Sequence, residues 1–456
     1  MKKFKLLVAS GCYIAALLWA YAVVISPAFF AEGYTLAWRN PAIMVWLVVL
    51  SLLPAVLLPY SIKTPSALIL WWLYLSTYVP SILVPAISLS MPIEKLFPLQ
   101  VSLLVSMSLL CIVPSRPILR VRRLSLSPHM FWASFVAIWV GCLSVVIVTG
   151  HPQNLVANVN SLFAGATEYD IRSLYFTESN HAIGYIVGQL GQAFDPFLIA
   201  YGLVFRRKPL VLAGVAGQVL IFSFTGFKVV LFSTFLLPLV FWFLRAGMRN
   251  FGLRMTYGLA GIIVACGVAD LAVPGSPFSG MITRRTLAGP GLLTGFYFEH
   301  YSEVAHPGIG YRFGTGALYG PSNEIGRVYF VSDHVDANAN LWAEGFADFG
   351  IGGILGFTLF VGFLIWMYDS AADPHRLDLA ALLAVLPAIS LGNTSPTTVV
   401  LTHGALAVVV LLYLSPTEAA DMAPEDEEET GCQENALPLQ EEAEEEEHEL
   451  MPAGVF

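Results

Sequence analysis

Charged side chains are scarce in this chain. Only 12% of its 456 residues are Asp, Glu, Lys or Arg, whereas 56% are hydrophobic and the mean hydropathy is +0.70. Soluble globular proteins carry about 25% charged residues. The shortage of charge therefore excludes an ordinary soluble fold and predicts long segments that lie within a lipid bilayer.

Several motifs of nucleotide and protease chemistry are also missing. The sequence has no Walker A loop, no dinucleotide-binding glycine fingerprint, no HExxH and no GxSxG. Its five cysteines show neither metal-ligand spacing nor a disulfide framework. ATP-driven transport and metalloprotease chemistry therefore lose support. We expect no metal, no cofactor and no nucleic-acid partner.

The chain does contain a series of long apolar segments. Hydrocarbon offers no hydrogen bonds to peptide groups, so a segment that crosses it must be a helix or a strand of a closed barrel, and barrel strands have only about ten residues. We therefore predict an all-α fold, a polytopic membrane helical bundle with about twelve transmembrane helices. The expected spans are 6–28, 41–60, 66–88, 98–114, 131–149, 182–205, 209–224, 229–244, 255–273, 346–368, 377–392 and 397–415.

Lysine and arginine are distributed unevenly between alternate loops. Of the 23 basic residues, 15 fall at the N-terminus or in loops on its side of the predicted bundle. Short loops rich in these residues stay in the cytoplasm. Both termini are therefore expected in the cytoplasm. The loops at about 150–181 and 274–345 would then lie outside, the second as the large outer loop.

Acidic residues are concentrated at the C-terminal end. Residues 418–456 contain fifteen of them and no Lys or Arg. Such a segment cannot bury an apolar core, so we predict an acidic, disordered cytoplasmic tail. Residues 1–417 would form the transmembrane helical domain.

The large outer loop holds a dense cluster of titratable residues, and its C-terminal end is the most regular part. Asp336, Asn340, Glu344 and Asp348 recur every four residues, which places them along one face of a helix. Carboxylates and amides there could hold sugar hydroxyls, act as a general base or accept bonds from loop arginines. A solvated helix face would show the same pattern, but charges near hydrocarbon are rare and usually functional.

The shorter outer loop and the spans after it add further polar groups. Asp170 and Arg172 lie within one short stretch, and an arginine can grip a phosphate while a carboxylate orients it, although an ordinary surface ion pair looks the same. Gln192 and Asp195 in the next span need a polar partner or a watery cavity. Lys228, at an outer turn, suits a lipid-linked phosphate, and a snorkelling lysine is the alternative.

Three short segments carry recognisable spacing. In RRTLAGPGLLTGFYFEHY, Arg284 is followed after ten residues by Gly295 and then by YFEHY. FTGFK stands directly before a span, and NANLWAEGFADFGIGG leads from the large loop back into the membrane. With two arginine-bearing outer loops, these segments resemble the Wzy-type polymerases of O-antigen, capsule and exopolysaccharide repeat units, within the O-antigen ligase and polymerase superfamily. The resemblance covers residues 165–368.

This resemblance implies glycosyl transfer between two glycans linked to undecaprenyl diphosphate, at the outer face of the bacterial cytoplasmic (inner) membrane. The partners would be the undecaprenyl-diphosphate-linked oligosaccharide and the lipid bilayer, with a chain-length regulator and a flippase as further candidates. The expected catalytic residues are His300, Glu299, Glu303 and Asp170. The expected diphosphate and glycan ligands are Arg172, Arg284, Arg285, Arg312, Lys228, Asn340 and Glu344.

Three alternatives stay open at this point. A ligase-like glycan transferase would move glycan to another acceptor with the same groups. A transporter or flippase would use Asp195, Gln192 and Lys228 inside the membrane. A scaffold subunit would tolerate substitution of all these residues.

Overall fold

The computed structural model describes residues 2–112, 126–149, 181–273, 275–313, 320–332 and 335–416. The chain divides into the units Met1–Pro416 and Thr417–Phe456, and the second lies wholly outside the described residues. The predicted acidic tail, the shorter outer loop and, within that loop, Asp170 and Arg172 also lie outside them.

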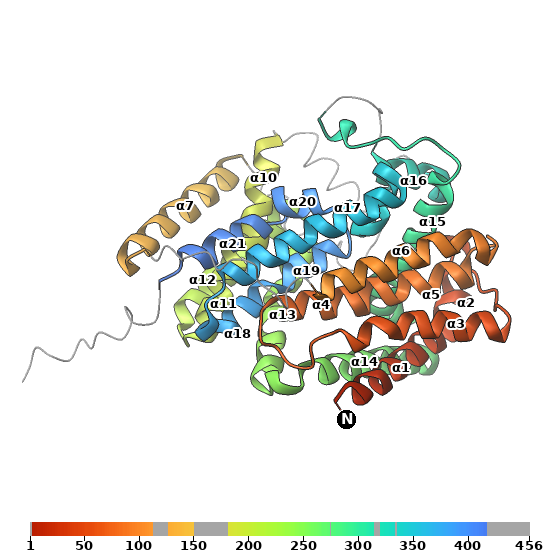
Figure 1. Ribbon diagram of the computed structural model, residues 1–456. Helices are drawn as coiled ribbons and strands as arrows, with labels where there is room; N and C mark the ends of the chain where they lie inside the picture. The colour runs from red at the N-terminus through yellow and green to blue at the C-terminus, as the bar shows by residue number, and fades with distance from the viewer. Residues whose placement is uncertain are drawn as a thin grey trace, which may run out of the picture. The chain divides into compact units, whose positions relative to one another are not determined.

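Every regular element in the described ranges is helical (Figure 1). The longer helices include π-helical turns at η1 (Tyr21–Ile25), η4 (Leu73–Tyr78), η7 (Leu190–Phe194) and η9 (Gly280–Ala288). The α-helices are α1 (Lys2–Ala20), α2 (Ser26–Phe29), α3 (Pro41–Leu52), α4 (Ser66–Trp72), α5 (Val79–Ser88), α6 (Ile93–Ile112), α7 (Pro128–Thr149), α10 (His181–Gln189), α11 (Asp195–Val204), α12 (Lys208–Thr225), α13 (Lys228–Arg245), α14 (Phe251–Ala272), α15 (Gly289–Tyr301), α16 (Pro321–Phe330), α17 (Leu341–Ala371), α18 (Leu377–Leu383), α19 (Val385–Leu391), α20 (Pro396–Leu401) and α21 (Ala405–Leu414).

Within the described residues, eight helices are long and apolar enough to cross a membrane. A ninth is added if the pair Pro374–Leu383 and Val385–Leu391, bent by 47°, is one broken span. The chain is thus a multi-pass helical membrane protein. The eight are Lys2–Glu32, Ser66–Ser88, Ile93–Ile112, Pro128–Thr149, Lys208–Thr225, Lys228–Arg245, Met248–Ala272 and Leu341–Ala371.

Four of the twelve expected spans are not among the eight helices: 377–392, which corresponds to the bent pair, and three others. The segment at 41–60 forms only the shorter helix Pro41–Val56, and 397–415 is divided at Gly404, whose φ is +74°. The segment at 182–205 is helical throughout as α10, η7 and α11, but the polar Gln192 and Asp195 lower its apolar character. Twelve spans therefore stay a prediction.

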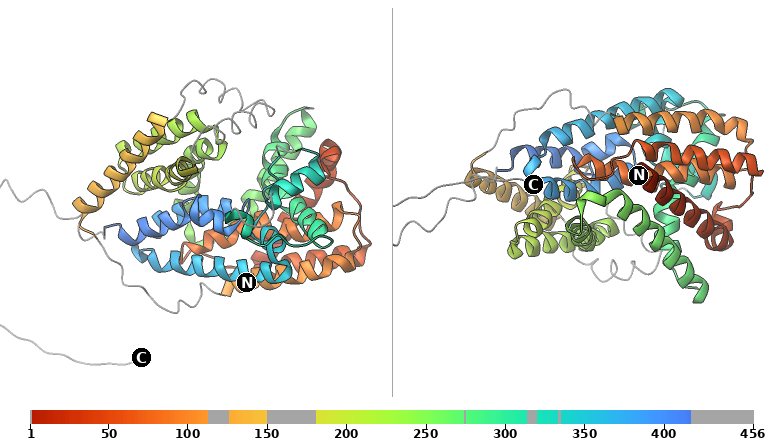
Figure 2. Two further views of the ribbon diagram at one scale, coloured as in Figure 1. Left: turned by 90° about the horizontal axis from the view of Figure 1, so that it is seen from above. Right: turned by 60° about the horizontal axis from the view of Figure 1, so that its bottom comes forward.

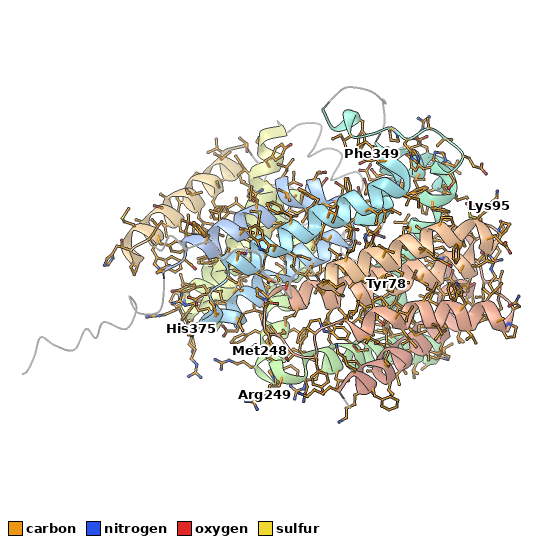
Figure 3. All side chains as sticks on the ribbon, viewed as in Figure 1. Tyr78, Lys95, Met248, Arg249, Phe349 and His375 are labelled. Atoms are coloured by element: carbon orange, nitrogen blue, oxygen red, sulfur yellow. The ribbon has the colours of Figure 1, made fainter. Side chains whose placement is uncertain are left out.

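The loops assigned to opposite sides of the membrane lie apart in the structure. Figure 3 places Arg249 and His375, which belong to predicted cytoplasmic loops, toward one edge. Lys95, which belongs to a predicted outer loop, lies toward the opposite edge, and so does Phe349, near the outer end of the span expected at 346–368. This is the separation that alternating loops require, whereas the cellular side of each edge stays a prediction.

The helix formed by α4, η4 and α5 lies at the centre of the core. Its aromatic rings follow one another from Trp71 to Tyr74 and Tyr78, with centroids 5.8 and 6.0 Å apart, and Tyr78 contacts Trp342 of α17 at 6.3 Å (Figure 3). The Tyr74 hydroxyl donates to the Ser51 carbonyl at 3.0 Å. This buried hydroxyl pairs with a backbone carbonyl because an unpaired polar group inside the protein costs free energy.

Helix α15 packs closely against α5. Figure 2 shows the packing of the helices from two further directions. A Cβ on Gly291 would lie 2.5 Å from the carbonyl oxygen of Pro80. We expect Gly291→Ala to lower the free energy of unfolding by about 1–3 kcal/mol, because the backbone at Pro80 cannot move aside easily. Gly356→Ala in α17 is the matched control, since nothing lies within 4 Å of its Cβ position. Equal thermal stability of the two variants in detergent would contradict this packing.

Candidate functional site

The predicted large outer loop is largely helical. Between the membrane helices α14 and α17 the chain forms η9, α15 and α16. Helix α15 continues directly from η9, whereas the proline at the start of α16 favours helix initiation, because an N-terminal N–H has no intrahelical partner to lose. Most of α15 is buried against α5 and α17. The candidate side chains therefore stand on rigid helices.

Glu324 of α16 bridges two side chains at the end of α15. Its Oε1 lies 3.0 Å from His300 Nε2, and its Oε2 accepts a hydrogen bond from the Tyr301 hydroxyl at 3.1 Å. The side chain of His300 is 12% exposed and that of Glu324 39% exposed. Both oxygens of the carboxylate are thus held, and the imidazole is fixed in orientation.

This arrangement sets the chemistry of the imidazole. A carboxylate accepts from an N–H, so Nε2 of neutral His300 carries the proton and Nδ1 carries the lone pair. Burial, and then the charge of Glu324, raises the pKa of Tyr301, which therefore remains a hydroxyl donor. Tyr301 donates a hydrogen bond to Glu324, and Glu324 accepts one from His300. This arrangement suits general-base chemistry at Nδ1 of His300.

A cavity of about 480 Å³ opens directly beside Glu324. Its lining combines a carboxylate, a guanidinium and a hydroxyl, which can bind a polar ligand. Val331 lies at the end of α16 with φ +51°, a region that β-branched residues rarely adopt. Such backbone strain is often found at functional sites. The lining residues are Glu324, Arg327, Val328, Val331 and Ser332.

Two further tyrosine–carboxylate pairs flank this site. The Tyr329 hydroxyl lies 3.0 Å from Glu299 Oε2. The Tyr297 hydroxyl lies 3.0 Å from both Glu344 Oε1 and the Ala337 carbonyl oxygen. Burial, and then the charge of Glu344, raises the pKa of Tyr297 well above its usual range. Glu299 and Glu344, both predicted site residues, are therefore held by buried or half-buried phenols.

The regular spacing from Asp336 to Asp348 is not one helix face. Helix α17 begins at Leu341, so Asp336 precedes it, and Asn340 caps it by accepting from the backbone N–H groups of Trp342 and Ala343. The Asn340 amide also donates to the Thr294 hydroxyl oxygen at 2.7 Å and to the Pro290 carbonyl at 3.3 Å. Its four hydrogen-bonding positions are used inside the protein, so its role is structural.

The two arginines of η9 differ in their surroundings. Arg284 pairs with Glu32 and lies over the Phe29 ring, 4.2 Å from its centroid. Burial raises the pKa of Tyr34 to about 12 even though Arg284 acts in the opposite direction. Arg285 is exposed and pairs with no acidic side chain in the described part of the chain. The structure thus holds Arg284 against the N-terminal helix and leaves Arg285 accessible to an anion.

A different outcome is therefore expected for each arginine. If the chain binds a diphosphate-linked substrate, as the resemblance implies, Arg285→Ala should raise the KM for it by about tenfold, the value of one charge-assisted hydrogen bond. Arg284→Ala should instead lower thermal stability, because it removes the contact with Glu32. Steady-state kinetics and thermal unfolding of the two purified variants separate these effects. A normal KM in Arg285→Ala would exclude it as a substrate ligand.

Three further candidates are Glu303, Lys228 and Arg312. Glu303 is exposed and forms no side-chain hydrogen bond with a described residue. Lys228 begins α13, beside the αL glycine Gly226. Only the backbone of Arg312 is described, in the turn Gly310–Phe313. Among the described residues, no group of three or more His, Cys, Asp or Glu side chains is placed to hold a metal ion.

Sequence reasoning did not select Glu324 or Tyr301. The signal available was Gly-Pro-Ser-Asn-Glu at 320–324, a helix start with an acidic residue in its first turn. That pattern predicts α16, but only the packing of α16 on α15 brings Glu324 to His300. His306 was also passed over, although its Nδ1 lies 3.0 Å from the Ala347 carbonyl oxygen at the start of α17.

Comparison with known proteins adds no relative to this description. No protein-family model, curated protein or solved structure matches the chain.

Proposed function

We propose that this chain is a membrane glycosyltransferase that polymerises oligosaccharide repeat units linked to undecaprenyl diphosphate, at the outer face of the bacterial cytoplasmic membrane. The supporting observation is the contact of Glu324 with both His300 and Tyr301, beside a polar cavity that Glu324 lines. The resemblance to Wzy-type polymerases supplies the substrate class. The buried Asn340, whose amide is satisfied internally, is no longer proposed as a ligand.

The proposed reaction needs a base at the acceptor hydroxyl. That hydroxyl belongs to the non-reducing end of the incoming repeat unit and attacks the anomeric carbon of the growing chain. Its proton passes to His300 Nδ1 while Glu324 stabilises the imidazolium that forms. The bond from the anomeric carbon to the diphosphate oxygen breaks, and undecaprenyl diphosphate leaves with the bonding electron pair.

The leaving diphosphate needs nearby cations. Arg285 is the exposed arginine of η9 and can donate to phosphate oxygens through its planar guanidinium. Arg327 lines the cavity next to Glu324 and is a second candidate. Neither step requires a nucleotide sugar, which agrees with the absence of nucleotide-binding motifs in the sequence.

The direct test uses the purified full-length chain in lipid nanodiscs with a lipid-linked repeat unit from its own host. The expected result is a ladder of products, each longer by one repeat unit, with release of undecaprenyl diphosphate. Transfer of single units to a different acceptor would support a ligase instead. Movement of the lipid-linked unit across sealed vesicles, with no new glycosidic bond, would support a transporter and overturn the proposal.

A further inference from the structure

A second polar cluster lies among apolar helices, apart from the His300 network. It surrounds η7, the π-helical turn between α10 and α11. In a π-helix the Gly191 carbonyl would accept from the N–H of residue 196, but residue 196 is proline and has none. The amide Nε2 of Gln218, on α12, donates to that carbonyl at 2.8 Å. Short π-helical segments inside longer helices are frequent at functional sites.

Asp195, one residue beyond η7, is fully buried beside this break. The indole N–H of Trp139 on α7 donates to its Oδ1 at 2.7 Å. Its Oδ2 is buried, and among the described residues this oxygen has no hydrogen-bond partner and Asp195 forms no ion pair. Gly217 of α12 supports the carboxylate, since a Cβ there would lie 2.6 Å from Asp195 Cγ. A carboxylate so enclosed requires a compensating positive charge or proton.

The neighbouring glutamines supply oxygens and no further donor to Asp195. Gln218 Oε1 is buried and has no partner among the described residues, and its orientation is fixed because Nε2 must donate to the Gly191 carbonyl. Gln192 Oε1, one turn from Asp195 on the same helix, is also buried and has no partner within the described ranges. Three acceptor oxygens therefore lie at one helical break, and each unmatched buried acceptor costs free energy.

In the part of the chain that the structure describes, no charged group offsets Asp195. The titratable residues on the helices packed around it form neither an ion pair nor a hydrogen bond with its carboxylate. They are His129 and Cys142 on α7, Tyr185 on α10, Tyr201 on α11, Lys208 on α12, Lys228 and Arg245 on α13, Asp378 on α18 and Tyr413 on α21.

We propose that Asp195, Gln218 and Gln192 form a binding site for a monovalent cation, either H⁺ or Na⁺. A proton on Asp195 Oδ2 creates an O–H donor for a glutamine oxygen, and Na⁺ is bound by the same oxygen atoms. Irregular turns inside membrane helices commonly bring oxygen atoms together to bind these two ions, and here side-chain oxygens take that place, because the Gly191 carbonyl is already bonded to Gln218. The site is separate from the proposed transferase reaction and does not depend on it.

The test measures the apparent Tm of the full-length chain in detergent, at about pH 6 and about pH 9, bracketing the pH at which such a carboxyl ionises. Each pH is tested in NaCl and in choline chloride of equal ionic strength. If Na⁺ is the ligand, NaCl raises the Tm at the higher pH by about 2 °C or more. If H⁺ is the ligand, the Tm falls by a similar amount as pH rises, without a sodium effect, because losing the proton leaves a buried negative charge.

Asp195→Asn keeps the shape, removes the charge and should abolish either response. Asp270→Asn is the matched control, because Asp270 is already bonded to Ser276 Oγ and to the backbone N–H groups of Phe278 and Ser279. It should respond as the wild type does. If Asp195→Asn does not fold, Gln218→Ala should weaken the sodium or pH response. A wild type that shows neither a sodium effect nor a fall in Tm with rising pH, or an Asp195→Asn variant that responds equally, overturns the proposal.

Discussion

His300→Asn is expected to lower the polymerisation rate by about 10²- to 10⁴-fold, the usual contribution of a positioned general base. The substitution removes the lone pair at Nδ1 and breaks the bond to Glu324. Glu324→Gln should cause a smaller loss, of about 10²-fold, because histidine remains but its imidazolium is no longer stabilised by charge. Product ladders, quantified with the lipid-linked repeat unit as substrate, give both rates.

Two observations separate catalysis from structural damage. Glu303→Gln, on the same turn but exposed, should keep the wild-type rate. The double variant of His300 and Glu324 should be no slower than His300→Asn alone, since the carboxylate acts only through the imidazole. Additive losses, or normal activity in His300→Asn, would remove this pair from the mechanism.

Local sequence patterns predict where helices form better than they predict which helices pack against each other. Apolar runs indicate helices because hydrocarbon requires internal hydrogen bonds, and the described fold is helical throughout. The sequence singled out the segment containing His300, but Glu324 lies 24 residues away on a different helix. The contact depends on how α16 packs against α15, and no spacing within either helix encodes it.

The same limit applies to the points where helices bend or begin. A run of apolar residues does not show where a helix bends, and the span expected at 377–392 is broken at Ala384. The four-residue repeat from Asp336 was read as one helix face, yet Asn340 is the cap at which α17 begins. A capping asparagine is recognisable from sequence only when the start of its helix is known.

Asn340→Ala is expected to lower the free energy of unfolding by about 3 kcal/mol, because it removes a helix cap and the two hydrogen bonds that join the start of α17 to α15. The Asn340 side chain accepts from two N–H groups at the start of α17 and donates to Thr294 and Pro290 on α15. Glu344, one turn further, bonds to Tyr297 of α15. Asn340 thus fixes the start of α17 against the helix that carries His300.

Asn40→Ala isolates the capping contribution from that of the interhelical bonds. Asn40 caps α3 by accepting from Ile43 N–H at 2.9 Å, but it is at the surface and donates to no second helix. Asn40→Ala should lower the free energy of unfolding by only about 1 kcal/mol. Chemical denaturation in mixed micelles can compare the two variants with the wild type. Equal losses of unfolding free energy in the two variants would mean that the bonds from Asn340 to α15 contribute nothing. A larger loss in Asn340→Ala, as expected, gives the contribution of the bonds between α15 and α17.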